Sequence, residues 1–163
     1  MIAYLCLGSN LHKPRAQVQK AVRLLAADPK ITVLRKSSLI RSVAYGETDQ
    51  PDFRNQVVEV KTDYTPHNLL QKLLTIENDM GRVRREKWGA RVIDIDILLY
   101  EDQILNSNTL VLPHPDFHNR RFAVQLLCEL EPELVHPVLG KTISALLDEL
   151  GGPEEEGEGE ELP

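Results

Sequence analysis

The chain of 163 residues is 42% hydrophobic and 27% charged, the composition of one globular domain that can bury a proper core. Its net charge of -6 comes from six glutamates within residues 151–163, so residues 1–150 are neutral in sum. That neutrality argues against a broad nucleic-acid surface, which needs a basic face, and no apolar stretch has the length of a membrane span. We therefore expect a cytoplasmic protein, a monomer or weak homodimer, without nucleic-acid or membrane partners.

Strand and helix patterns alternate in the first half of the chain. Residues 2–7 form an apolar strand that ends at the turn residues Gly8-Ser9-Asn10, and Pro14 lies in the first turn of the helix that follows. β-branched residues predict one long strand over residues 31–43. A polar loop over residues 44–52 then leads into a third strand over residues 53–61.

The second half begins with a helix that Thr65-Pro66 opens, and a strand over residues 92–99 follows it. After a loop or short strand over residues 106–116, Asn119 opens a third helix, and residues 143–150 make a short last helix. The order βαββαβαα predicts an α+β fold, a ferredoxin-like α/β sandwich with a mainly antiparallel sheet and helices packed on it. Residues 1–150 would form this domain, and residues 151–163, which have no apolar face to bury, a disordered acidic tail.

Two aspartates lie two residues apart in the strand VIDIDILL, at Asp94 and Asp96. Because strand side chains alternate between faces, both carboxylates point the same way, with Cα atoms roughly 6.5–7 Å apart, and the neighbouring isoleucines point the other way. Mg²⁺ commonly reaches proteins through one or two carboxylates plus substrate phosphates. An antiparallel strand with one solvated face has the same pattern, so the pair alone leaves metal binding open.

A loop crowded with cations precedes this strand. Its charged residues are Arg82, Arg84, Arg85, Lys87 and Arg91, with Trp88 among them. Guanidinium groups beside a carboxylate pair predict a polyphosphate held between arginine side chains and metal. The chain has no P-loop motif, so side chains and metal would have to hold the phosphates.

Other residues have both a functional and a structural interpretation. Phe53 and Asn55 share one face of a strand, where a flat heterocycle could stack on the ring and the amide could bind its edge. Alternatively, Phe53 belongs to the core and Asn55 is a turn or edge residue. His114 could donate to a phosphate from its place between two prolines, or be incidental. Arg120 puts a positive charge at the start of a helix, which the helix dipole makes unfavourable. A bound anion would offset this unfavourable placement. Glu77 could belong to the site, or it could simply lie on the exposed face of its helix.

Four segments resemble the 6-hydroxymethyl-7,8-dihydropterin pyrophosphokinase family, in order and in spacing. They are LGSN at 7–10, DQPDFRN at 49–55, GRVRREKWGARVIDIDILLY at 81–100 and LPHPDFHNRRF at 112–122. The resemblance covers roughly residues 1–150. It implies a ferredoxin-like α/β sandwich and an enzyme of folate biosynthesis, an ATP-dependent diphosphotransferase. Such an enzyme transfers the terminal diphosphate of ATP to the hydroxymethyl group of a reduced pterin and releases AMP.

The resemblance also implies a role for each matching residue. Asp94 and Asp96 would hold two Mg²⁺ ions across the triphosphate, and Arg82 and Arg91 would complete the catalytic set. The residues implied for the pterin are Ser42, Val43, Ala44, Tyr45, Phe53, Asn55 and Phe122. Those implied for ATP are Glu77, Arg84, Trp88, Ile97, His114 and Arg120.

The chain departs from some members of that family. Val43-Ala44 stands where a Pro-Pro pair is often found, and Pro115 replaces an aromatic residue of some members. Leu74 and Thr109 stand where other members use polar or cationic contacts to the nucleotide. These departures concern individual ATP contacts, not the reaction.

Two interpretations from other classes remain open on the residues alone. A regulatory module that senses ATP–Mg²⁺ without turnover would explain the aspartate pair and the arginines, but not Phe53, Asn55 and Phe122. A small RNA-binding α/β domain would use the arginine loop on phosphates and Trp88 for stacking. It predicts steep salt dependence and no need for Mg²⁺.

Overall fold

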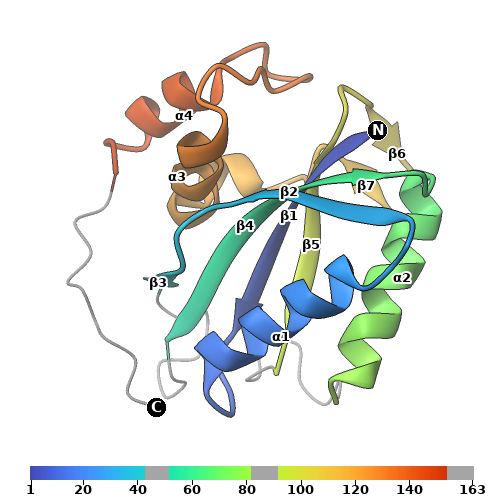
Figure 1. The fold of residues 1–163 in the computed structure, drawn as a ribbon. Helices are drawn as coiled ribbons and strands as arrows, with labels where there is room; N and C mark the ends of the chain where they lie inside the picture. The colour runs from blue at the N-terminus through green and yellow to red at the C-terminus, as the bar shows by residue number, and fades with distance from the viewer. Residues whose placement is uncertain (43–51, 82–91, 154–163) are drawn as a thin grey trace.

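The computed structural model describes residues 1–42, 52–81 and 92–153 of the chain. Its main sheet has five strands (Figure 1): β1 (Ile2–Ser9), β2 (Ile31–Lys36), β3 (Ile40–Ser42), β4 (Phe53–Thr62) and β5 (Asp94–Tyr100). The hydrogen-bonded order is β2-β4-β1-β5, with β3 also paired to β4, and every pairing is antiparallel. Two short strands, β6 (Leu105–Asn106) and β7 (Val111–Leu112), form a separate sheet.

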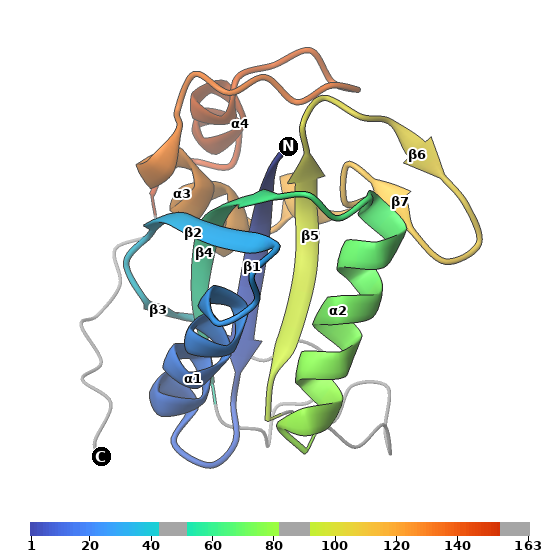
Figure 2. The same cartoon turned by 45° about the vertical axis from the view of Figure 1, so that its right-hand side comes forward.

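Helices cover both faces of the main sheet (Figure 2). α1 (Pro14–Ala26) and α2 (Pro66–Asp79) pack on one face; α3 (Arg121–Leu130), α4 (Ile143–Glu149) and the 3₁₀ turn η1 (Phe117–Asn119) pack on the other. The βαββαβ order and the strand order are ferredoxin-like, so the predicted α+β sandwich with its mainly antiparallel sheet is confirmed. No helix within the described ranges is both long enough and apolar enough to cross a bilayer.

The spacing of apolar residues and the residues at the N-termini explain why α1 and α2 form. The residues that recur at helical spacing in α1 are all buried: Val18, Ala21, Val22 and Leu25. Thr65 caps α2 as predicted, because its hydroxyl accepts a hydrogen bond from the Asn68 N–H at 3.3 Å. Pro66 occupies the first turn, where a missing N–H costs nothing.

The long strand predicted over residues 31–43 is instead two strands, β2 and β3. Between them, the Ser37 hydroxyl accepts a hydrogen bond from the Val57 N–H at 2.9 Å. The Gln56 side-chain amide also donates to the Ser37 carbonyl at 2.7 Å. Side-chain hydrogen bonds of this kind compete with a strand ladder, so β2 ends at Lys36.

Two further boundaries differ from the prediction. β1 continues through Gly8 and Ser9, expected as a turn, because Gly8 pairs with Asn55 on one side and with Asp94 on the other. The third helix begins at Arg121 and not at Asn119, because a 3₁₀ turn closes first. The tail expected over residues 151–163 is described only as far as residue 153, so its predicted disorder lies outside the described residues.

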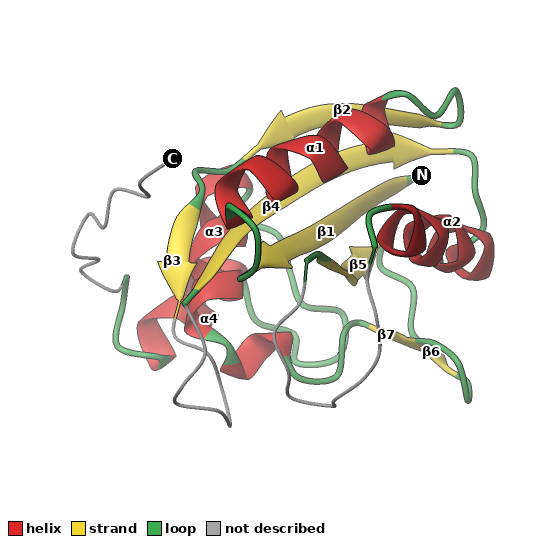
Figure 3. Cartoon of the chain, turned by 90° about the horizontal axis from the view of Figure 1, so that it is seen from below, coloured by secondary structure: helices red, strands yellow, loops and turns green. Residues whose placement is uncertain are grey.

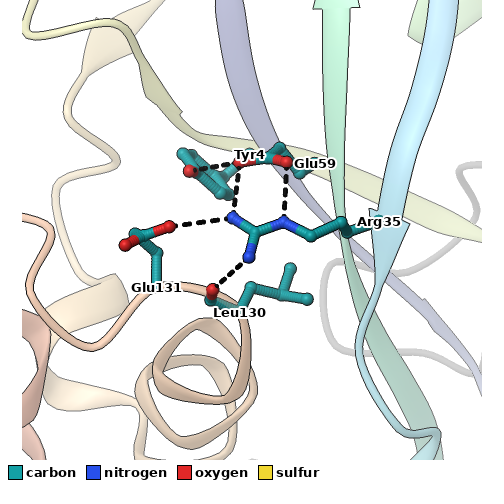
Figure 4. A network of polar contacts seen from close by, with 5 residues as sticks. All are labelled: Tyr4, Arg35, Glu59, Leu130 and Glu131. Carbon is teal, nitrogen blue, oxygen red and sulfur yellow. Dashed lines mark hydrogen bonds and ion pairs between the residues drawn. The ribbon is translucent and has the colours of Figure 1, made fainter.

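A polar network around Arg35 ties the second helical layer to the sheet (Figure 4). Arg35 of β2 donates two hydrogen bonds to the Glu59 carboxylate, both at 2.9 Å, and Tyr4 donates to the same carboxylate at 2.6 Å. The guanidinium also donates to the Leu130 carbonyl at 2.6 Å and to the Glu131 carboxylate at 2.9 Å, where α3 ends. Arg35 thereby joins β2 and β4 to the end of α3, and Tyr4 adds β1 through Glu59.

Candidate active site

β1 ends, and β4 and β5 begin, at the end of the sheet that Figure 3 shows from below. On β5, Asp94 and Asp96 are half-buried. The isoleucines that alternate with them are buried in the cluster that α1 and α2 cover: Ile93, Ile95 and Ile97. Both carboxylates therefore lie on the other face, as predicted.

The strand register brings Asp94 and Asn55 to either side of Gly8. Gly8 is the Cα partner of Asp94 on β5 and of Asn55 on β4. An added Cβ at Gly8 would lie 2.8 Å from Asn55 Oδ1 and 3.6 Å from Phe53 Cδ1, so only glycine leaves room for this amide. The sequence interpretation of Gly8 as a turn residue missed this role. The available signal was a glycine within an apolar strand, which is typical of a close approach.

Three of the residues predicted to bind the pterin lie together beside Gly8. Asn55 is only 4% exposed, and its Nδ2 donates to the Ser42 hydroxyl at 2.5 Å. Ser42 is the Cα partner of Phe53, which is half-buried and is not one of the buried core residues. A fourth, Phe122, is half-buried in the first turn of α3 and packs against the apolar cluster of that face.

Arg120 faces the carboxylate pair from the position that precedes α3. Its Nη1 lies 3.8 Å from Asp96 Oδ2, and its Nε lies 3.5 Å from Asp116 Oδ2. Two carboxylates thus offset the unfavourable placement of a cation at a helix start. Arg121 points elsewhere, since its guanidinium donates to the Leu150 carbonyl, as expected of one of two adjacent helix residues.

His114 is held as a neutral hydrogen-bond donor. Its Nδ1 accepts the Asp116 N–H at 3.1 Å, and its own backbone N–H donates to the Leu98 carbonyl at 2.9 Å. Burial, together with the charge of Arg120, lowers the pKa of His114 to about 4. The imidazole is therefore neutral at pH 7, and because Nδ1 accepts, the ring proton lies on Nε2.

A cavity of about 270 Å³ opens between β5 and the segment that leads to β7. Asp96, Ile97 and His114 line it, together with Thr109 and Pro115. Apolar walls beside a few polar groups are typical of small-molecule sites. The cavity therefore brings together two residues predicted to bind ATP and one of the two carboxylates predicted to bind metal.

Glu77 of α2 is buried behind the carboxylate pair. It is 3% exposed, and its Oε2 accepts the Ile95 N–H at 2.7 Å. The alternative of an exposed helix face is therefore wrong. Since β5 is at the edge of the sheet, this side chain takes the place of a missing strand and fixes the backbone between Asp94 and Asp96.

Several predicted site residues lie outside the described ranges. They are Val43, Ala44 and Tyr45 of the pterin set, and Arg82, Arg84, Trp88 and Arg91 of the cationic loop. Their predicted roles stay predictions. Phe53, Asn55, Asp94 and Asp96, in contrast, are placed on one face by the register of three strands.

The carboxylate pair suits a metal that arrives with its own ligands. Within the described ranges, no group of three or more His, Cys, Asp or Glu side chains could hold an ion by itself. Mg²⁺ usually takes one or two carboxylates and keeps water and phosphate oxygens as its remaining ligands. Two carboxylates beside a small-molecule cavity therefore fit a Mg²⁺–nucleotide better than a dedicated structural metal.

Comparison with known proteins gives a consistent family match. The sequence model of the 7,8-dihydro-6-hydroxymethylpterin-pyrophosphokinase (HPPK) family matches residues 4–132. The chain is 41% identical to a 2-amino-4-hydroxy-6-hydroxymethyldihydropteridine pyrophosphokinase of Haemophilus influenzae, over 83% of this chain and 84% of that protein. It is 44% identical to the protein of the same name from Methylorubrum extorquens, over 91% of this chain and 92% of the relative.

Solved structures share the fold at low sequence identity. The wild-type HPPK-DHPS of Plasmodium falciparum with pteroate superposes with a TM-score of 0.73 at 18% identity. The match covers 91% of this chain and 42% of that one, so the chain spans less than half of the larger protein. At this identity the likeness concerns the fold alone.

Proposed function

Since the chain belongs to the 7,8-dihydro-6-hydroxymethylpterin-pyrophosphokinase family, we propose that the sheet end around Gly8 performs the reaction of that family. The reaction is transfer of diphosphate from ATP to the hydroxymethyl group of 6-hydroxymethyl-7,8-dihydropterin, with release of AMP, in folate biosynthesis. The observation that carries the proposal is the register Asp94–Gly8–Asn55, because it puts a carboxylate pair and a buried amide on one face.

The pterin would lie on the β3–β4 side of this face. Asn55 Oδ1, beside Gly8, can accept from an amino group at the edge of the heterocycle, while Ser42 holds the amide in place. The rings of Phe53 and Phe122 would contact the flat faces of the pterin. The backbone of Val43, Ala44 and Tyr45 would complete this subsite.

ATP would lie on the β5 side, with part of the nucleotide in the cavity beside Ile97 and His114. His114 offers a neutral N–H donor, and Arg120 offers a full positive charge to the phosphates. Glu77 would act by holding β5 in place and not by direct contact. Arg84 and Trp88 are the predicted contacts from the cationic loop.

Asp94 and Asp96 would hold Mg²⁺, which neutralises phosphate charge and orients the attacking and leaving oxygens when it is bound. The hydroxymethyl oxygen attacks the β-phosphorus in line and releases its proton to water, the bond from that phosphorus to the α-phosphate oxygen breaks, and AMP leaves with that oxygen. Arg82 and Arg91 would balance the charge on the transferred group. Arg120 would turn from Asp96 toward the phosphates once that carboxylate is engaged.

One incubation tests the proposal: the protein with ATP, Mg²⁺ and the reduced hydroxymethylpterin, followed by separation of the nucleotides. AMP should form only when the pterin is present. ADP instead of AMP would indicate an ordinary kinase. Tight ATP binding without turnover would favour the sensor, and Mg²⁺-independent, salt-sensitive RNA binding would favour the RNA-binding domain.

A further inference from the structure

A second cavity, of about 450 Å³, lies on the face of the sheet that α1 covers, away from the carboxylate pair. α1 forms one wall, and the end of β2 with the segment before β3 forms the other. Figure 3 shows α1 crossing above β4 on this face. The volume of this cavity is within the range of about 300–1,000 Å³ that small-molecule sites occupy.

Three cations border this α1–β2 cavity, and no acidic side chain of the described residues lines it. Arg15 and Arg23 lie on α1, eight residues and so about 12 Å apart along the helix, and Lys36 faces them from the end of β2. Among the described residues, neither Arg23 nor Lys36 forms an ion pair, whereas Lys72, Arg120 and Lys141 each face a carboxylate. The cavity therefore has a positive rim that attracts an anion.

The interior of the cavity has a different chemistry. Val22 and Leu39 contribute apolar surface, and the buried Gln56 of β4 lines the cavity with them. Gln56 Nε2 is occupied by the Ser37 carbonyl at 2.7 Å, which leaves Oε1 without a protein donor among the described residues. At the rim, Ser38 donates to Glu129 of α3 through its N–H and its hydroxyl, at 2.9 and 2.6 Å, and is thereby fixed.

We propose that the α1–β2 cavity binds a nucleoside phosphate. Its phosphate would lie at the cationic rim, near Arg23 and Lys36, and its base between Val22 and Leu39. An amino group of the base would donate to Gln56 Oε1. A free phosphate would use only the rim and a neutral nucleoside only the interior, whereas a nucleoside phosphate uses both. This site lies at the β2 edge of the sheet and the proposed catalytic ATP site beside β5 at the other edge, so either one can exist without the other.

Amide NMR titration of the full-length protein with AMP, without Mg²⁺, tests this site directly. Saturable shifts are expected at the backbone amides of Ser38 and Leu39 and at the side-chain amide of Gln56. Thr109 and Leu110, which line the other cavity, report separately on AMP bound there. Inorganic phosphate and adenosine are titrated in parallel, and each should bind at least tenfold more weakly than AMP.

Charge reversal at the rim supplies the decisive variants. Arg23→Glu and Lys36→Glu should each raise the Kd read at Gln56 at least tenfold and leave the shifts at Thr109 unchanged. Lys20→Glu is the matched control, because Lys20 is an exposed cation of α1 that does not line the cavity. The proposal is overturned if AMP gives no saturable shift at Ser38 and Gln56, or if the rim variants bind like the control. Equal affinity for inorganic phosphate or adenosine would equally remove the nucleoside phosphate as its ligand.

Discussion

Asp96 and Arg120 lie 3.8 Å apart, and the side chain of each is about one third exposed. Exposed pairs at this distance contribute little to folding, about 0–1 kcal/mol. A ligand that replaces this ion pair therefore costs the fold little stability. His114 beside them differs, since its burial gives it a defined protonation state that Arg120 reinforces.

Asp94→Asn and Asp96→Asn should each lower turnover about 10²-fold or more, because an amide is a far weaker Mg²⁺ ligand than a carboxylate. Urea unfolding should show a change below about 1 kcal/mol for both variants. Asp102→Asn is the matched control, as it removes an exposed carboxylate from the turn after β5. Full turnover in either site variant would exclude that carboxylate from the reaction.

The titration of His114 should have its midpoint near pH 4 in the free protein, because burial and Arg120 lower the pKa of the ring. The unfolded chain binds this proton near pH 6.5, so His114 should make the protein less stable as the pH falls from about 6.5 to about 4. NMR of the ring protons measures the midpoint. Arg120→Ala should raise it, whereas Arg23→Ala, on the opposite face, should not.

At the scale of elements, the two ends of β1 are fixed by different means. Near Tyr4, the Arg35 network joins three strands to α3. The Arg35 guanidinium lowers the pKa of Glu59 through its hydrogen bonds to that carboxylate. Near Gly8, the strands approach closely because a side chain is absent. We expect the first end to serve stability and the second to serve the proposed site, so substitutions at the two ends should have separable effects.

Gly8→Ala should impair the pterin side of the site. The new Cβ would lie 2.8 Å from Asn55 Oδ1, so the amide would have to move, and the KM for the pterin should rise about tenfold. The KM for ATP should stay the same. If the effect runs through Asn55, the double variant with Asn55→Ala should be no worse than Asn55→Ala alone. Additive losses would show that Gly8 acts by another route.

Arg35→Ala should destabilise the fold without changing the chemistry. Glu59 is only 8% exposed and would lose its cation, at a cost of about 2 kcal/mol in the free energy of unfolding. Lys141→Ala, which breaks the exposed pair with Glu149, is the control and should cost well under 1 kcal/mol. Urea titration compares the two. Equal losses would mean that the network of Figure 4 contributes no more than a surface pair.

At the scale of the whole molecule, the sequence predicted the features that depend on interactions between neighbouring residues. The alternation at Asp94 and Asp96 and the cap at Thr65 depend on a few neighbouring residues, and both were correct. The break at Ser37 depends on Gln56, and the burial of Glu77 depends on Ile95, each many positions away. Such features need the strand register, which the sequence alone does not provide.

The acidic tail should be dispensable for activity. α4 ends at Glu149, and the apolar clusters of the described residues extend no further than Leu150. A protein that stops after residue 153 should keep its turnover and its unfolding midpoint, because the sequence of the tail has no apolar face to bury. Assay and thermal unfolding of the shortened protein measure both. Loss of turnover with an unchanged midpoint would assign the tail a part in the reaction.

The start of β5 also constrains how the gene can vary. Isoleucines and aspartates alternate there, so the deletion or insertion of one codon would exchange the two faces at once. The aspartates would then point into the apolar core, and the isoleucines would take their place in the proposed site. One-residue insertions and deletions within β5 should therefore be absent from functional relatives. A single substitution can be tolerated, because it changes only one face of the strand.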